Sequence, residues 1–177
     1  QGRFVNGKRN AAIHRIRARF ALTERTISLG VEQNPATVTF HLEDDRPRLE
    51  SWFSDYFGFP VKVIQDQQMG FPDDTASPGP TVISTATLQQ VSEWFPDLNL
   101  ADLRLRFRTN LELEDTEPFW EERLYGQEGS TVPFSIGEVA IAGVNPCQRC
   151  IVPTRDAITG NPYPEFQKTL VQQRQAT

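Results

Sequence analysis

The chain has 177 residues, of which 38% are hydrophobic, and its formal net charge is −5. This composition excludes disordered and collagen-like chains, and it allows one large hydrophobic core or two small ones. Because no segment approaches the roughly 18 apolar residues of a spanning helix and the N-terminus lacks a secretory apolar region, we expect no membrane association. The two cysteines are only three residues apart and would close too small a loop to stabilise a secreted fold, so we expect a cytoplasmic location.

The basic residues are concentrated near the N-terminus. Residues 1–25 contain seven basic residues and one acidic residue, whereas the rest of the chain is acidic. From Arg15 to Phe20, arginines alternate with apolar residues, which is typical of a strand with one buried face. A basic segment could face phosphate, but the acidic remainder argues against a general nucleic-acid binder. We therefore expect no nucleic-acid partner.

The N-terminal segments predict β structure. The Asn6-Gly7 pair is the strongest local signal for a type I′ hairpin turn, so strands are expected on both sides of it. Residues 13–22, 26–31 and 37–42 alternate polar and apolar side chains and are separated by turn residues. This pattern predicts an antiparallel meander, as in half of a small barrel or sandwich.

A helix is predicted after this meander, with Pro47 at its entry and Gly58 at its exit. Its apolar residues follow the spacing of one helical face, and they are Leu49, Trp52, Phe53, Tyr56 and Phe57. A short strand is predicted at residues 61–65. The proline-rich segment 66–81 is expected to be a loop between two domains.

The second half of the chain mixes strands and helices. Residues 81–95 predict a strand that runs into a helix with hydroxyl side chains at its N-terminus, and residues 107–114 predict another strand. Residues 132–144 predict two strands around Gly137, and residues 163–175 predict a final helix with Pro164 in its first turn. The predicted class is a β-dominated α+β fold.

Both cysteines lie in the segment NPCQRCIVPTRDAITG, residues 145–160. A zinc site would need four ligands, but His14 and His41 are isolated and distant in sequence. A redox-active dithiol needs a helix N-terminus, whereas residues 151–153 predict a continuing strand. These observations disfavour both sites, and two other interpretations are preferred: small side chains buried in a strand, or one thiolate that binds a metal held mainly by a non-protein group. The residues alone do not choose between them.

This segment resembles the signature of the MOSC family (molybdenum cofactor sulfurase C-terminal domain), in which Arg-Cys is followed by Asp and Thr-Gly. Three further blocks match in the same order, SPGPTVISTATL, RFRTNLEL and PFWEERL. The block GRFVNGKRN and the meander resemble the family's N-terminal β-barrel domain. The resemblance implies a partial N-terminal domain at residues 1–68 and a MOSC domain at residues 69–177, with a β-barrel core and peripheral helices. The family's opening Lys-Ser element and closing C-terminal strand have no counterpart here.

The chain is similar to amidoxime-reducing members of the family and their bacterial relatives. The resemblance implies that it binds the molybdenum cofactor, a pterin dithiolene that holds molybdenum, and reduces N-hydroxylated compounds. In the family motif the cysteine directly after arginine is the metal ligand, so the expected ligand and catalytic residue is Cys150. Because an iron-sulfur domain would need four cysteines, we expect the electrons to come from a separate ferredoxin or flavoprotein.

Six other residues match family positions that contact the cofactor, and they are Ser84, Thr85, Arg108, Asn110, Arg149 and Asp156. Arg108 and Asn110 are two apart on a predicted strand, so they would share one face. Arg149 is adjacent to Cys150, so a bulge or turn is needed if both are to reach the cofactor.

Each of these positions also has an ordinary structural interpretation. Hydroxyls at the start of a helix commonly cap it, which is the alternative for Ser84 and Thr85. Arg108 would otherwise be a surface cation, like its neighbours Arg104 and Arg106. Asp156 would otherwise form an Asx turn before Thr159-Gly160.

Two other functions stay open at this point. Cys150 or Cys147 could carry a persulfide and deliver sulfur to the cofactor or to another acceptor. Alternatively, the chain binds pterin without turnover. The simplest interpretation of Cys147 is a small packed side chain. Glu121 and Glu122 are expected to be structural or rim residues, because adjacent side chains rarely converge on one substrate.

Overall fold

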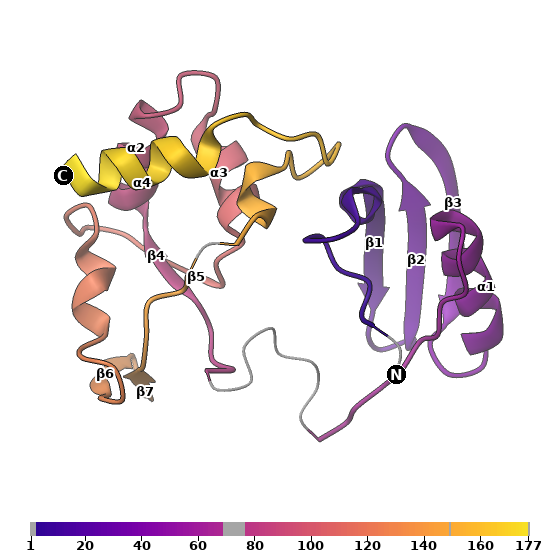
Figure 1. The fold of residues 1–177 in the computed structure, drawn as a ribbon. Coiled ribbons are helices and arrows are strands. Elements are labelled where there is room, and N and C mark those ends of the chain that lie inside the picture. Colours follow the sequence, from indigo (N-terminus) through magenta and orange to yellow (C-terminus); the bar gives the residue numbers. More distant parts are fainter. Residues whose placement is uncertain (1–2, 69–76, 149, 177) are drawn as a thin grey trace. The chain divides into compact units, whose positions relative to one another are not determined.

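The computed structural model describes residues 3–68, 77–148 and 150–176, which form two compact units (Figure 1). Unit 1 comprises Gln1–Phe71 with Arg155–Pro162, and unit 2 comprises Pro72–Thr154 with Tyr163–Thr177. The sequence-based boundary between residues 68 and 69 stays a prediction. Within the described residues, no helix combines the length and the apolar character needed to cross a bilayer.

The elements confirm a mixed α+β fold. In chain order they are η1 (Ala11–Arg15), β1 (Ile16–Ala21), β2 (Thr26–Val31), β3 (Asn34–His41), α1 (Arg46–Phe57), β4 (Val82–Ser84), α2 (Thr85–Glu93), α3 (Leu100–Phe107), β5 (Leu111–Leu113), η2 (Trp120–Leu124), β6 (Val132–Ile136), β7 (Val139–Gly143), η3 (Val152–Thr154) and α4 (Phe166–Ala176). Of the described residues, 32% are helical and 23% lie in strands, so strands do not predominate. These strands form separate sheets of three, two and two, and they do not close into a barrel.

The predicted meander of unit 1 is confirmed. The strands β1, β2 and β3 pair antiparallel in this order, and α1 packs beside β3 (Figure 1). Ile27 is paired with Phe40, and both are buried together with Leu29 and Leu49 of α1. The apolar faces that alternation predicted for β2 and β3 therefore lie in this core, whereas the buried face predicted for β1 is not found, because Phe20 is 57% exposed.

The helix α1 begins and ends where the sequence predicts. A proline occupies its first turn, where no intrahelical N–H is needed. Gly58 ends it in the left-handed region at φ 75°, and its N–H donates to the carbonyl oxygen of Ser54 at 2.9 Å. Trp52 and Phe53 pack against the core of unit 1.

Two predictions for unit 1 are wrong. Asn6-Gly7 does not form a hairpin, because the carbonyl oxygen of Asn6 accepts the N–H groups of Arg9 and Asn10, and the chain continues into η1. Residues 61–65 do not form a strand. The N–H of Val63 donates to a carboxylate oxygen of Glu50 at 3.0 Å, so a side chain of α1 takes the hydrogen bond that a neighbouring strand would have made.

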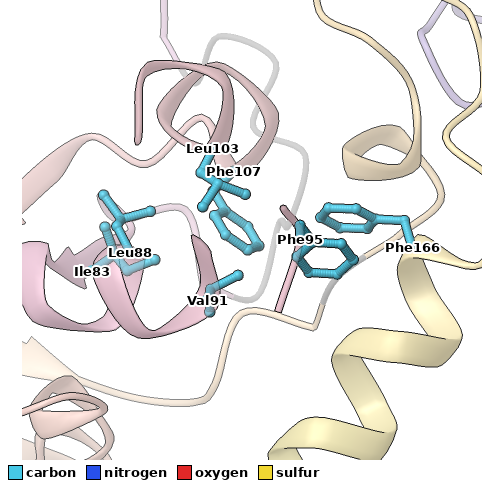
Figure 2. Packing of buried hydrophobic residues seen from close by; sticks show 7 residues of the cluster. All are labelled: Ile83, Leu88, Val91, Phe95, Leu103, Phe107 and Phe166. Carbon is cyan, nitrogen blue, oxygen red and sulfur yellow. The ribbon is translucent and has the colours of Figure 1, made fainter. Parts of the chain in front are cut away.

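Unit 2 is built around a short parallel pair, β4 and β5, joined through α2 and α3. Its core brings together seven buried side chains (Figure 2), which are Ile83, Leu88, Val91, Phe95, Leu103, Phe107 and Phe166. The rings of Phe95 and Phe166 face each other with centroids 4.6 Å apart. This contact fixes α4 against the end of α2 although the two lie far apart in sequence.

The helix α3 differs from the prediction, which placed a strand from residue 107. The side chain of Asn99 accepts the N–H groups of Ala101 and Asp102, and the carboxylate of Asp102 accepts the N–H of Asn99. This reciprocal capping box starts a helix that continues to Phe107. The strand is therefore shorter than predicted, at Leu111–Leu113.

The hairpin of β6 and β7 confirms the two strands predicted around Gly137, which adopts a φ of 59° at the turn. Gly143, the last residue of β7, lies directly against the carbonyl of Leu124 in η2. A Cβ atom built on Gly143 would be 1.6 Å from that oxygen, so a glycine is required at this close approach. The final helix α4 is confirmed, but it begins at Phe166, so Pro164 precedes it.

Candidate cofactor site

The two cysteines lie in the connection between β7 and η3. Cys147 is exposed and Cys150 is half-buried, and the two thiols are not joined in a disulfide. Within the described residues, the thiol of Cys150 has no hydrogen-bond partner. Among the residues that the structure places, this thiol is therefore a soft donor without a hydrogen-bond partner.

The strand predicted at residues 151–153 is wrong, because this segment turns into η3. The N–H and the hydroxyl of Thr154 both donate to the carbonyl oxygen of Ile151, at 3.1 and 2.7 Å. These bonds close a helical turn immediately after Cys150. Arg149, the adjacent candidate, lies outside the described residues, so the bend expected between it and Cys150 stays a prediction.

The hydroxyl residues at the junction of β4 and α2 form an internal network. Ser84 is fully buried, and its Oγ accepts the N–H of Thr87 and donates to the Oγ1 of Thr87. The same Oγ1 accepts the N–H of Phe119 at 2.6 Å and donates to a carboxylate oxygen of Glu121 at 3.0 Å. Ser84 thus caps α2, and the network ties η2 to this cap.

Thr85 faces a carboxylate that an arginine already holds. Its Oγ1 donates to Glu112 at 2.8 Å, and Arg104 donates to the same carboxylate from Nε and Nη2 at 2.8 and 2.7 Å. The hydrogen bond from Arg104 is the largest influence and lowers the pKa of Glu112, partial burial opposes it, and the hydrogen bond from Thr85 adds a smaller lowering. A bidentate pair of this kind fixes the orientation of both side chains.

This pair predicts a pH dependence. Because the pKa of Glu112 is below its ordinary value of 4.5 in the folded protein, the pair stabilises the fold above that value and is lost as the pH falls through the lowered folded pKa. Glu112→Gln is therefore expected to lower the urea midpoint of unfolding at pH 7, and this effect is expected to shrink as the pH is lowered below 4.5. Glu114→Gln is the matched control two residues away, and an equal, pH-independent effect of both substitutions would contradict this assignment.

Arg108 and Asn110 do not share a strand face, which corrects the sequence-based placement. Arg108 ends α3 in the left-handed region at φ 53°, and its guanidinium has no partner among the described residues. Asn110 lies before β5, where its Oδ1 accepts the N–H and the hydroxyl of Thr81 at 2.9 and 3.1 Å. The cause is α3, whose last turn must reverse the chain at Arg108 before the strand begins.

Asp156 belongs to unit 1, whereas Cys150 belongs to unit 2. The Oδ1 of Asp156 accepts the N–H groups of Ile158 and Thr159 and the hydroxyl of Thr159, and its carbonyl oxygen accepts the N–H of Gly160. The Asx turn that the sequence offered as the ordinary interpretation is therefore present.

Arg106, which contacts the chain three residues after Cys150, is a residue that sequence reasoning missed. It was grouped with surface cations, but it is 5% exposed, and its Nη1 donates to the carbonyl oxygen of Pro153 in η3 at 3.0 Å. The available signal was the helical spacing with Leu103, which places both residues on the inner side of α3. Glu121 and Glu122 have structural contacts, to Thr87 and to Arg174 respectively.

Within the described residues, no group of three or more His, Cys, Asp and Glu side chains is arranged to hold a metal ion. The comparison with protein families gives one match: the model of the MOSC domain matches residues 80–177. No curated protein and no solved structure matches the chain significantly. The family match includes the α2 cap, the segment after α3 and both cysteines.

Proposed function

Since the chain belongs to the MOSC family, which is associated with binding or sulfuration of the molybdenum cofactor, we propose that it binds this cofactor through Cys150 and reduces N-hydroxylated compounds. The observation that carries the proposal is the exposure and the hydrogen bonding of the Cys150 thiol. Its thiol is half-buried and has no hydrogen-bond partner among the described residues. A soft thiolate in this condition suits molybdenum.

Among the side chains of unit 2 that match family positions, one offers a donor group that suits the cofactor directly. The guanidinium of Arg108 is exposed and uncommitted within the described residues, and a guanidinium fork suits the phosphate of the pterin side chain. Thr85 and Asn110 would contribute only by exchanging their present partners, Glu112 and Thr81. The hydroxyl of Ser84 is enclosed, so we assign it to holding the start of α2 in place rather than to direct contact.

The bound cofactor would supply the redox chemistry needed to cleave an N–O bond. Reduction of an amidoxime to an amidine consumes two electrons and two protons and releases water. We propose that a separate ferredoxin or flavoprotein supplies the electrons. In this scheme Cys150 would hold the metal, and Arg108, together with Arg149 and Asp156 as further proposed contacts, would hold the cofactor's polar groups.

A second candidate function is sulfur transfer, in which a persulfide on a cysteine donates its outer sulfur to the cofactor or another acceptor. The exposure of Cys147 favours it, because a sulfur donor must be reached by its acceptor. The family's association with sulfuration points the same way.

One set of measurements separates these functions. The protein is prepared from cells that make the molybdenum cofactor, and molybdenum, pterin and cyanide-releasable sulfur are measured per chain. Reduction of benzamidoxime is then followed with a chemically reduced viologen as the electron source. We expect bound molybdenum, pterin and benzamidine formation. Releasable sulfur without molybdenum would support sulfur transfer instead, and bound cofactor without reduction of any N-hydroxylated compound would indicate a binding module.

A further inference from the structure

The side chain of Arg106 has an unusual position for an arginine. It is 5% exposed, and its guanidinium carbon lies 5.5 Å from the ring centroid of Tyr163 and 5.6 Å from that of Phe166. Its Nη1 donates to the carbonyl oxygen of Pro153 at 3.0 Å. Burying a charge is costly unless such partners compensate it, so a structural purpose for this contact is expected.

The backbone directly after Cys150 is held at several points. The carbonyl oxygen of Ile151 accepts two bonds from Thr154, and the carbonyl oxygen of Thr154 accepts the N–H of Tyr163 at 2.6 Å. These bonds fix the turn of η3 and join it to the segment that leads into α4. Four residues after the thiol, at Thr154, the chain is therefore already joined to the segment that packs on the core of unit 2.

The hydrogen bond from Arg106 to the carbonyl oxygen of Pro153 also joins η3 to α3. Pro153, whose carbonyl it holds, is buried, and η3 packs beside both α3 and α4. On the other side of Cys150 the situation is different, because residues 144–148 are exposed and form no helix or strand. The chain is therefore tied to the helices of unit 2 on the C-terminal side of Cys150, where Arg106 supplies a charged hydrogen bond.

We infer that Arg106 is a positioning residue for Cys150, and that its guanidinium holds η3 so that the thiol is presented in one fixed place. The part of this inference that concerns molybdenum rests on the proposed function, whereas the part that concerns the thiol does not. Lysine would offer one point charge in place of a planar group that contacts two rings and a carbonyl. Methionine would keep apolar volume but remove both the donor and the charge.

The test measures the rate at which iodoacetamide alkylates Cys150 in a Cys147→Ser background, where Cys150 is the single cysteine. Arg106→Met is expected to raise this rate about tenfold, the factor that one charged hydrogen bond typically contributes to a local opening equilibrium. Arg106→Lys is expected to give an intermediate rate, because it keeps a donor. Molybdenum per chain, measured on the same preparations, is expected to fall in the same order.

Val91→Ala is the matched control, because Val91 is 2% exposed in the same core but lies on α2. The variants are compared at temperatures where equal fractions are unfolded, which removes the effect of global opening. An unchanged rate in Arg106→Met, or an equal rise in Val91→Ala, would overturn the inference. A faster rate in Arg106→Met together with no molybdenum in the parent protein would support the role of Arg106 and would count against the proposed function. If Arg106→Met does not fold, the alkylation rates of Arg106→Lys and Val91→Ala are compared instead. A rise in Arg106→Lys that is no larger than the rise in Val91→Ala would then overturn the inference.

Discussion

Cys150→Ser is expected to lower the molybdenum bound per chain by more than about tenfold, because even residues that only support a metal ligand typically change affinity roughly 10- to 100-fold when mutated. Serine has nearly the size of cysteine, but its hydroxyl is a hard donor that stays protonated at neutral pH. The substitution therefore changes the chemistry of the donor and not the packing. Molybdenum is measured by elemental analysis, and pterin by fluorescence after oxidation.

Cys147→Ser is the matched control for this experiment. It lies three residues away on the same connection and is exposed, so the same change of donor there is expected to leave bound molybdenum close to that of the parent protein. Far-UV circular dichroism checks that both variants are folded. Equal molybdenum in Cys150→Ser and the parent protein would end the ligand assignment, and loss in Cys147→Ser alone would transfer it to the other cysteine.

Gly143→Ala is expected to have the largest effect on stability. An added Cβ atom would lie 1.6 Å from the carbonyl oxygen of Leu124 and 2.7 Å from its carbon, and neither backbone atom can move without shifting η2 or β7. The backbone at Gly143 is outside the left-handed region, so the cost is a steric clash and not a conformational preference. We expect a loss of about 3 kcal/mol or more in the free energy of unfolding of unit 2.

Gly79→Ala provides the control, because a Cβ atom built there meets no atom within 4 Å and its φ is also outside the left-handed region. Its free energy of unfolding is expected to stay within about 0.5 kcal/mol of the parent value. Urea titrations followed by tryptophan fluorescence report on unit 2 through Trp94 and Trp120. A Gly143→Ala protein as stable as Gly79→Ala would show that the contact with Leu124 is readily relaxed.

Local signals predicted the elements whose ends are set by their own residues. Pro47 and Gly58 mark the two ends of α1, Gly137 turns the hairpin of β6 and β7, and Asp156 closes its turn by accepting hydrogen bonds from residues 158–160. In each case the contact that sets the helix end or the turn joins residues close in sequence, so the sequence pattern is sufficient to predict it.

Contacts between distant segments account for the predictions that failed. Residues 61–65 have the composition of a strand, but Glu50 and Ser54 of α1 take their N–H groups. The spacing with Leu103 places Arg106 on the inner side of α3, but it does not reveal that the rings of Tyr163 and Phe166 lie against the guanidinium there. The same difference between local and distant signals applies to the candidate site. The resemblance selected Cys150 from its local motif. Only the three-dimensional contacts showed that Ser84 is enclosed and that Arg108 does not lie on a strand.

The placement of residues 155–162 with unit 1 limits how the chain can be dissected. Arg17 of β1 donates to the carbonyl oxygen of Ile158 at 3.2 Å, and Gly160 lies against the carbonyl of Ala11. Cutting the chain after residue 68 would give an N-terminal fragment that keeps Arg17 but loses the loop that Arg17 binds. The C-terminal fragment would keep this loop but lose the residues of unit 1 that it contacts. Truncation therefore leaves both pieces incomplete, and each half of the protein is better studied by point substitution in the intact chain.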